Sequence, residues 1–504
     1  MTEQHAAQGR GDRKVVGLLA LLIAGYVAAT AAGWTRMAPH RGHAGPKQAA
    51  LATAEMPAAG RPHPTPLWLM LPFALLLGAI AVLPLMDPTA HWWESNLHKF
   101  YVAANLALVT LLGIALVHPT AGLARAESTL VHTVVDEYIP FIVLLFSLYT
   151  ICGGIRIAAD LPAHSWTNTK FMLAGGLLAS LIGTTGAAML LIRPLVETNR
   201  ERRHVAHTIV FFIFVVCNCG GLLLPLGDPP LFLGYLAGVE FLWTLRLWKS
   251  WLLINGLLLA VYFAWDHFYC YRREATCDLV RNEAHTHRVW FSGLWPNGLL
   301  LLGIVLSVAL LDSSQMLPGT DWQPWFYLRE AVQLSLVLAS LLLGAHHVRL
   351  SNAFDYVAIT EVAVLFIGVF VSMQPALEIL KLRGGQLGLD TPAKYFWATG
   401  VLSSLLDNAP TYLVFFETAK AKTAAGWGAG GETMAGVATP LLAAISLGAV
   451  MMGAMTYIGN GPNFMVKTIA EKSGIKMPSF FGYTVYSCCV LLPILCLDRW
   501  LFGE

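Results

Sequence analysis

The stretch PLGDPP at 225–230 decides how this chain must fold. Around it, from 208 to 243, the sequence is largely apolar, so Asp228 lies inside a segment long enough to cross a bilayer. An ionised carboxylate at that depth costs at least about 2.5 kcal/mol on insertion scales. Gly227 and the two following prolines prevent a regular helix, so backbone carbonyls become free to coordinate a cation beside the positive amino-terminal end of the next half-helix. The pattern predicts an ion-binding site at a break in a transmembrane helix, with Asn218 earlier in the run as an amide ligand.

A second motif, LLDNAPT at 405–411, offers the complementary ligands. Its apolar run, 395–419, is interrupted in the middle, which favours a re-entrant hairpin because backbone can break at membrane depth only where protein or a wet cavity shields it. We expect Asp407 at the hairpin tip, with Asn408 and Thr411 beside it. Carboxylate, amide, hydroxyl and carbonyl oxygens are the ligands that a hard cation such as sodium requires. Since sodium and protons would compete for the same carboxylate, the motif is typical of a site that exchanges one for the other.

The overall composition places these motifs in a membrane protein. Of 504 residues, 56% are hydrophobic and 12% are charged, whereas a soluble domain carries about 25% charged residues. The net charge of +2 gives no basic surface for nucleic acid, and the expected partner is the lipid bilayer. The apolar runs predict an all-α polytopic membrane protein with about 10–12 transmembrane helices. Those runs cover 67–86, 99–117, 131–152, 207–243, 252–267, 291–311, 331–346, 356–379, 434–469 and 480–501, in addition to the two interrupted hairpins.

Two regions of the chain, 131–243 and 356–470, repeat the same order of features. Each region opens with a span and continues with an interrupted hairpin and a broken span. The first hairpin covers 171–196, and the break that corresponds to PLGDPP in the second region is YIGNGPN at 457–463. The number of crossings gives the two regions opposite orientations. Inverted repeats with discontinuous helices at corresponding positions indicate a secondary transporter whose site lies between the halves.

Two segments at the amino-terminal end precede the transporter domain. Residues 1–33 combine basic residues with an apolar stretch, which fits either a secretory signal or a first transmembrane segment. Residues 34–66 are rich in Ala, Pro and His, which is typical of a flexible linker. The transporter domain is therefore expected over 67–504. Arginines after the first hairpin predict a cytoplasmic loop there, although the basic residues that flank the second hairpin fall outside in the same arrangement.

The breaks and hairpin tips supply the candidate ion-binding residues. These are Asp407, Asn408, Thr411, Asp228, Gly227, Asn218, Thr184, Thr185, Gly459, Asn460 and Asn463. Glu137 and Glu361 open the first spans of the two repeats and are candidates for proton coupling. The alternatives are a structural cap for the aspartates, interhelical hydrogen bonding for the threonines and asparagines, and a membrane-interface position for the glutamates. No catalytic residue, cofactor or resident metal is expected, because sodium and protons would be substrates.

The pairing of LLDNAPT with PLGDPP and IGNGPN resembles the ion transporter superfamily, over roughly 67 to the carboxyl end. Within it, the chain is most similar to a bacterial branch of sodium:proton antiporters and citrate transporters. The resemblance implies a multi-pass homodimer in the bacterial inner membrane, with a scaffold domain and a transport domain that moves by an elevator-type step. It further implies sodium:proton antiport by alternating access, with a cation-coupled citrate, dicarboxylate or arsenite transporter as the alternative. Dicarboxylate carriers show Ser-Asn-Thr at both tips, whereas here the tips hold Gly183-Thr184-Thr185 and Asp407, which favours a cation.

Two other protein classes fit the intramembrane acids less well. An intramembrane aspartyl protease would resemble Tyr-Asp followed by Gly-x-Gly-Asp, but Pro225 replaces the first glycine and Leu406 precedes the other aspartate. A channel can also be lined by broken helices, but two inverted halves favour alternating access. The sequence contains neither a phosphate-binding Walker loop nor a His-Glu-x-x-His motif. We therefore expect a transporter without enzymatic activity.

Overall fold

The computed structural model of the chain describes residues 2–37, 65–117, 122–274, 288–313, 320, 322–352 and 354–503. Helix accounts for 78% of the structure. Strands in the described residues form two short ribbons, β1 (Arg156–Asp160) with β2 (Arg288–Ser292) and β3 (Thr433–Met434) with β4 (Val437–Ala438). The predicted all-α membrane class is confirmed. Most of the predicted linker, 34–66, lies outside the described residues.

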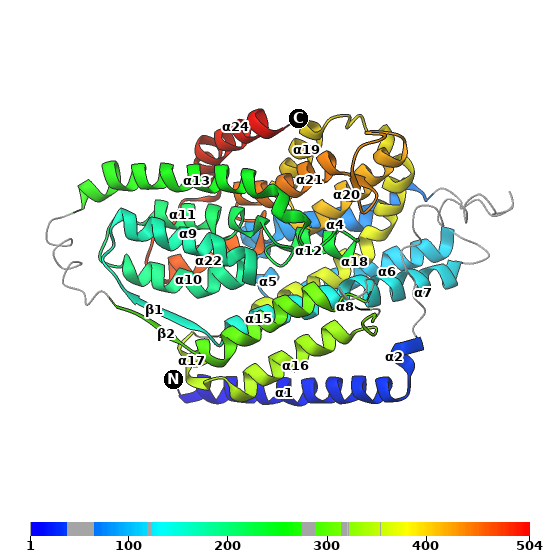
Figure 1. Cartoon of the computed structure of the whole chain (residues 1–504), viewed down its shortest axis with the longest axis horizontal. Helices are drawn as coiled ribbons and strands as arrows, with labels where there is room; N and C mark the ends of the chain where they lie inside the picture. Colours follow the sequence, from blue (N-terminus) through cyan, green and yellow to red (C-terminus); the bar gives the residue numbers. More distant parts are fainter. Residues whose placement is uncertain are drawn as a thin grey trace.

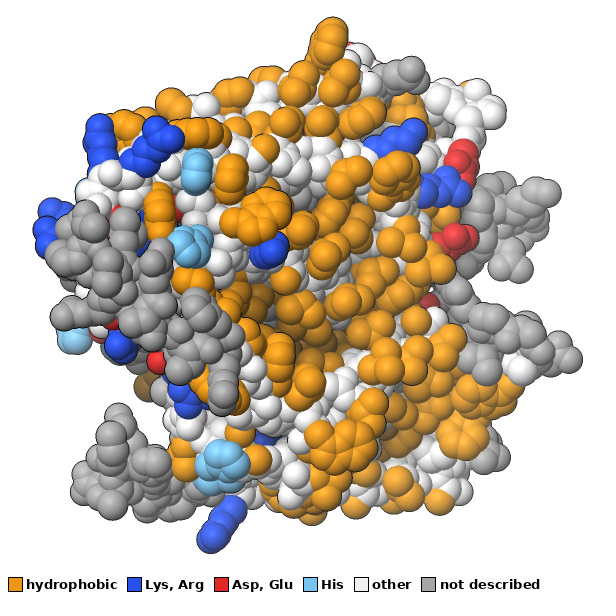
Figure 2. All heavy atoms as spheres, turned by 60° about the vertical axis from the view of Figure 1, so that its left-hand side comes forward, with side chains coloured by type: hydrophobic (Ala, Val, Ile, Leu, Met, Phe, Trp, Pro, Cys, Tyr) orange, Lys and Arg blue, Asp and Glu red, His pale blue; other side chains and the backbone are white. Residues whose placement is uncertain are grey.

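Apolar helices supply the predicted spans. Within the described ranges, six are long and apolar enough to cross a membrane, namely Asp12–Ala31, Asn96–Val117, Gly122–Cys152, Trp243–Arg273, Val357–Arg383 and Phe480–Phe502. Shorter apolar helices are Leu67–Val82, Ala206–Leu222, Leu294–Leu310 and Thr439–Met455. Figure 2 shows one face of the molecule covered by hydrophobic side chains, with Lys and Arg mostly toward its margins. Lipid is the solvent that suits such a surface.

The elements follow one another as two halves of similar layout. The first half contains α1 (Thr2–Ala31), α2 (Trp34–Met37), η2 (Leu67–Met70), α4 (Leu71–Val82), η3 (Leu83–Leu85), α5 (Asp87–Trp93), α6 (Asn96–Val117), α7 (Gly122–His132), η4 (Thr133–Tyr138), α8 (Ile139–Cys152), α9 (Ser165–Ile182), α10 (Thr184–Thr198), α11 (Ala206–Val215), η5 (Cys219–Leu222), α12 (Pro229–Leu236), η6 (Trp243–Leu247), α13 (Trp248–Trp265), η7 (Asp266–Cys270) and η8 (Tyr271–Arg273). The second contains α15 (Leu294–Leu310), α16 (Leu328–Leu343), α17 (His346–Ser351), α18 (Val357–Arg383), η9 (Gly384–Gln386), α19 (Pro392–Leu405), α20 (Asn408–Ala424), α21 (Thr439–Met452), η10 (Gly453–Met455), α22 (Gly461–Lys472), α23 (Phe480–Tyr486), η11 (Ser487–Leu491) and α24 (Leu492–Phe502).

Both predicted hairpins are present, and each turns at its motif. The first is α9 and α10, which meet at Gly183, where φ is 83° and only glycine fits without strain. The second is α19 and α20, which meet at Leu406 and Asp407. The helices extend beyond the predicted runs, 171–196 and 395–419, because their outer turns contain polar residues that a hydropathy pattern does not detect.

Both predicted broken helices are present as well. In the first, α11 gives way to η5 and an irregular segment before α12 begins after Asp228; in the second, α21 gives way to η10 before α22 begins after Asn460. Asp228 (φ −144°, ψ 142°) and Asn460 (φ −151°, ψ 138°) have nearly the same extended backbone at the amino-terminal caps of these half-helices. The two residues therefore hold equivalent places in the two repeats.

The two repeats interlock around α11. Every residue of α11 from His207 to Val215 is buried, and an apolar helix that is enclosed on all sides lies in the interior. The second arm of each hairpin packs against the second half of the other repeat's broken helix, so α10 contacts α22 and α20 contacts α12. This exchange of partners brings both hairpin tips and both breaks to the centre of the fold. By contrast, α1 lies along α16 at the edge of the molecule (Figure 1).

Candidate functional site

Asp228 is the centre of a buried polar cluster drawn from both repeats. Its side chain is enclosed, and the residue is 1% exposed. The Thr184 hydroxyl donates to Asp228 Oδ1 at 2.9 Å, from the tip of the first hairpin. Asn408 Nδ2 donates to Asp228 Oδ2 at 2.6 Å from the second hairpin, and Asn460 Nδ2 donates to Oδ1 at 3.2 Å from the second break. Three segments remote in sequence thus converge on one carboxylate.

The electrostatics of Asp228 are unusual because all three of these donors are neutral. No ion pair to Asp228 exists in the part of the chain that the structure describes. The following half-helix begins with Pro229 and Pro230, which have no N–H to offer the carboxylate. A buried charge without a partner is strongly unfavourable. The geometry therefore suits a carboxylate that is neutralised by a proton or by a bound cation.

Three asparagines join the two breaks to one another. Asn460 Nδ2 lies 3.1 Å from Asn218 Oδ1, and Asn218 Nδ2 donates to Asn463 Oδ1 at 2.8 Å. Asn463 Nδ2 in turn donates to the carbonyls of Gly453 and Thr456 at 2.9 and 3.0 Å. Because unwound backbone needs hydrogen-bond partners when it is buried, this amide chain holds the broken segments in place.

The second hairpin reaches Asp228 through Asn408, and the Asp407 side chain makes a different contact. Asp407 Oδ1 accepts a hydrogen bond from the Ala409 N–H at 3.0 Å and so caps α20, while the Thr411 hydroxyl donates to the Asp407 carbonyl at 2.9 Å. The Asp407 and Asp228 carboxylates interact electrostatically. Asn408 Oδ1 is buried and has no hydrogen-bond partner among the described residues, so it is an acceptor open to a cation.

The predicted glycines act through their backbone. The Gly227 carbonyl accepts from the Thr184 N–H at 2.8 Å, and a Cβ at Gly227 would overlap the carbonyl oxygen of Gly221. A Cβ at Gly459 would likewise lie 2.6 Å from the Gly453 carbonyl oxygen. Each break thus requires glycine where the chain folds back on itself. Thr185 is half-buried and makes no side-chain hydrogen bond to the cluster in the described ranges.

The two predicted proton-coupling glutamates lie outside this cluster. Glu361 forms an ion pair with Lys99, whose Nζ lies 2.6 Å from Glu361 Oε1. Glu137 accepts a hydrogen bond from Gln374 Nε2 at 2.9 Å. The structure therefore does not bring either glutamate into contact with Asp228, because each is held by a partner on another helix.

A second buried ionic group was not found from the sequence. Asp266 pairs with Arg202, and His207 Nε2 lies 2.8 Å from Asp266 Oδ1. His207, Asp266 and Cys270 offer ligand atoms within 4.8 Å of one another, as a metal site would. The Arg202 guanidinium already neutralises the carboxylate, however, so a structural pair explains these residues better than a cation site. The separation of the partners along the chain hid the group from sequence reasoning.

Comparison with known families decides where the chain belongs. A family model with the description "Putative citrate transport" matches residues 63–503. The chain belongs to this citrate transport family. The family is part of the ion transporter superfamily, as the resemblance of the two breaks indicated. Membership in the citrate transport family makes the chain a multi-pass secondary transporter of the membrane. A search of curated proteins gives no match.

Proposed function

We propose that this protein exchanges a monovalent cation, sodium, for protons at Asp228. The observation that carries the proposal is the enclosed Asp228 carboxylate with three neutral donors. A bound sodium ion or a proton would each remove the unfavourable charge, and the two cannot occupy the carboxylate together. The site would therefore take one on each side of the membrane in exchange for the other.

Alternating access follows from the same energetics. A site with an unneutralised carboxylate meets a penalty of at least about 2.5 kcal/mol at membrane depth, so the loaded states are the ones that cross. We propose that, within the transporter domain at 67–504, the hairpin tips at Thr184 and Asn408 move with Asp228 as one unit, in an elevator-type step relative to a scaffold formed by the rest of that domain. A homodimer in the bacterial inner membrane would provide the fixed frame for this movement.

Cation-coupled citrate transport is the second candidate, because the family description names citrate. In that case Asp228 would hold the coupling cation, and the citrate would need a separate set of donors. A tricarboxylate next to Asp228 is disfavoured, because both groups carry negative charge. The hydrogen-bond donors to Asp228 are neutral amides and a hydroxyl, and the described residues form no ion pair with Asp228.

Everted vesicles from an antiporter-deficient strain separate the two candidates. We expect added sodium to dissipate a preformed pH gradient in vesicles with the wild-type protein and to leave it unchanged with Asp228→Asn. Asp390→Asn is the matched control, because Asp390 is an exposed loop carboxylate paired with Lys394 and Lys422. A pH gradient that added sodium does not change, together with sodium-dependent uptake of labelled citrate, would refute antiport and support citrate transport.

A further inference from the structure

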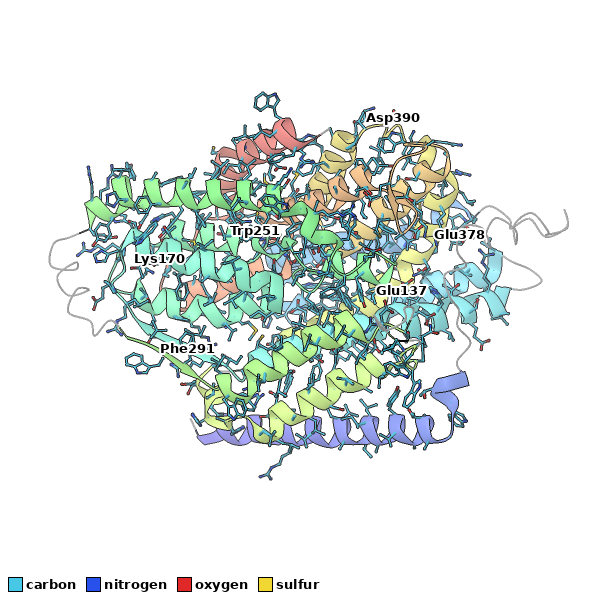
Figure 3. All side chains as sticks on the ribbon, viewed as in Figure 1. Glu137, Lys170, Trp251, Phe291, Glu378 and Asp390 are labelled. Atoms are coloured by element: carbon cyan, nitrogen blue, oxygen red, sulfur yellow. The ribbon has the colours of Figure 1, made fainter. Side chains whose placement is uncertain are left out.

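A polar cavity of about 340 Å³ lies where η2, α7 and α18 meet. Its polar lining consists of Thr65, Arg125, Thr129, Gln374, Glu378 and Lys381. Arg125 and Glu378 form an ion pair and so neutralise one another. Figure 3 shows Glu378 and Glu137 on the same side of the molecule, away from Trp251, whose indole donates to the first break at Gly220. The cavity is therefore separate from the Asp228 cluster.

Both helices beside this cavity depart from regular α geometry. Glu137 lies in η4, which is a turn of π-helix between α7 and α8. Pro375 lies inside α18 and removes one backbone N–H from that helix. The two irregular turns face each other, since Gln374 Nε2 donates to Glu137 Oε2 at 2.9 Å. Single π-turns inside helices are frequent at functional sites, and this one positions a carboxylate.

Lys381 interacts with two carboxylates, and the contacts of the described residues include no hydrogen bond to either. Its Nζ is 3.9 Å from Glu417 Oε2, longer than the roughly 2.8 Å of a charged hydrogen bond. That Glu417 oxygen is enclosed and has no hydrogen-bond partner in the described part of the chain. Lys381 also interacts electrostatically with Glu137. The Lys381 side chain is 59% exposed and lines the cavity together with Gln374, which donates to Glu137.

Glu417 connects this region to the ion site through a single helix. It lies on α20, which begins at Asn408, the donor to Asp228 Oδ2. At 1.5 Å per residue, Glu417 is about 14 Å from Asn408 along that helix. Glu137 and Lys381 lie on other helices, so a movement of α20 relative to α18 changes the distance from Glu417 to Lys381.

We propose that Lys381 is a switching counter-ion that couples the position of the second hairpin to the charge on Glu137. Lys381 pairs with Glu417 when α20 is close to α18, and with Glu137 when α20 is displaced. The proposal rests on the proposed function, because it takes α20 as part of the moving unit. The other charged groups that act on Glu137 are Glu417 itself, His132, whose Nδ1 lies 3.7 Å from Glu137 Oε1, and the neighbouring carboxylate of Asp136. His132 and Asp136 do not lie on α20, whereas Glu417 does, so displacement of α20 removes a carboxylate from Glu137 as well as freeing Lys381.

Exchange kinetics and sodium binding together test this role. Lys381→Met and Glu417→Gln should each slow sodium-driven proton movement about tenfold, a usual size for coupling between two sites. Sodium affinity measured by calorimetry should stay within about twofold of wild type, since neither residue touches Asp228. Adding Glu137→Gln to Lys381→Met should produce no further loss, and the conservative Lys381→Arg, which keeps a cation that can pair with either acid, should keep exchange near the wild-type rate. Asp390→Asn, which breaks an ion pair of α20 within its own hairpin, is the matched control.

Multiplicative losses in the Lys381→Met, Glu137→Gln double variant would overturn the switch, as would a Lys381→Arg variant that exchanges as slowly as Lys381→Met. Should Lys381→Met fail to fold, Glu417→Gln carries the test because it preserves shape and volume. Wild-type vesicles that show citrate uptake but no sodium-driven proton movement would refute the proposed function alone. The same variants are then compared for citrate uptake, where the switch predicts the same loss in Lys381→Met and the same retained rate in Lys381→Arg.

Discussion

The replacement Asp228→Asn removes the charge on which the proposed exchange depends. Asn cannot bind a proton or balance a cation, so the neutral site gains nothing from either substrate. The penalty avoided by loading the wild-type carboxylate, at least about 2.5 kcal/mol, corresponds to a factor of roughly 70 in favour of the loaded carrier. We expect sodium-driven proton movement to fall by at least that factor. The new amide also keeps one acceptor oxygen where the carboxylate accepts from three donors through two oxygens, and a mispaired buried donor costs about 1–3 kcal/mol of stability.

A swapped pair separates the loss of charge from the loss of fold. In Asp228→Asn with Asn408→Asp the amide and the carboxylate exchange places, so the hydrogen bond between the two positions is restored. The double variant should regain thermal stability, measured by fluorescence-detected gel filtration, and part of the exchange activity in everted vesicles. An Asp228→Asn protein that folds normally and exchanges sodium for protons within threefold of wild type would refute the reasoning.

Three further outcomes follow from the structure. Gly227→Ala should prevent folding or abolish transport, because a Cβ there overlaps a backbone carbonyl. Gly256→Ala, with open space around its Cβ, should do neither. The yield of protein in the membrane and the transport rate test both expectations. Asn463→Ala leaves two buried carbonyls without their donor and should lower the free energy of unfolding by about 1–3 kcal/mol, measured by thermal unfolding in detergent. The purified protein should retain α1, since Asp12 accepts a hydrogen bond from Tyr356 at 3.1 Å. Amino-terminal sequencing tests this expectation, and a first residue beyond α1 would show that a signal had been cleaved.

Local chemistry explains why the breaks and hairpins could be predicted. Gly and Pro interrupt a helix wherever they occur in an apolar run, so PLGDPP and LLDNAPT mark their turns whatever the tertiary contacts. The asparagines were identified for the same reason, because an amide in such a run requires a partner. The order of hairpin and break also occurs twice in the sequence, once in each repeat.

Rotation about a helix explains what could not be predicted. Successive residues of a helix point about 100° apart, so the sequence could not decide whether Asp407 or Asn408 would face Asp228. Asn408 does so, and Asp407 caps its own helix. Long-range pairs were equally hidden, since Glu361 with Lys99 and Glu417 with Lys381 join helices that are remote along the chain.

The most direct test of the account is the number of protons that sodium displaces from the purified protein. Calorimetric titration with sodium in two buffers of different ionisation enthalpy gives this number. If Asp228 holds either a proton or a sodium ion, binding of one sodium releases up to one proton, and Asp228→Asn shows neither the binding nor the release. Sodium that binds wild type without releasing protons at any pH, or that binds Asp228→Asn equally well, would contradict the account.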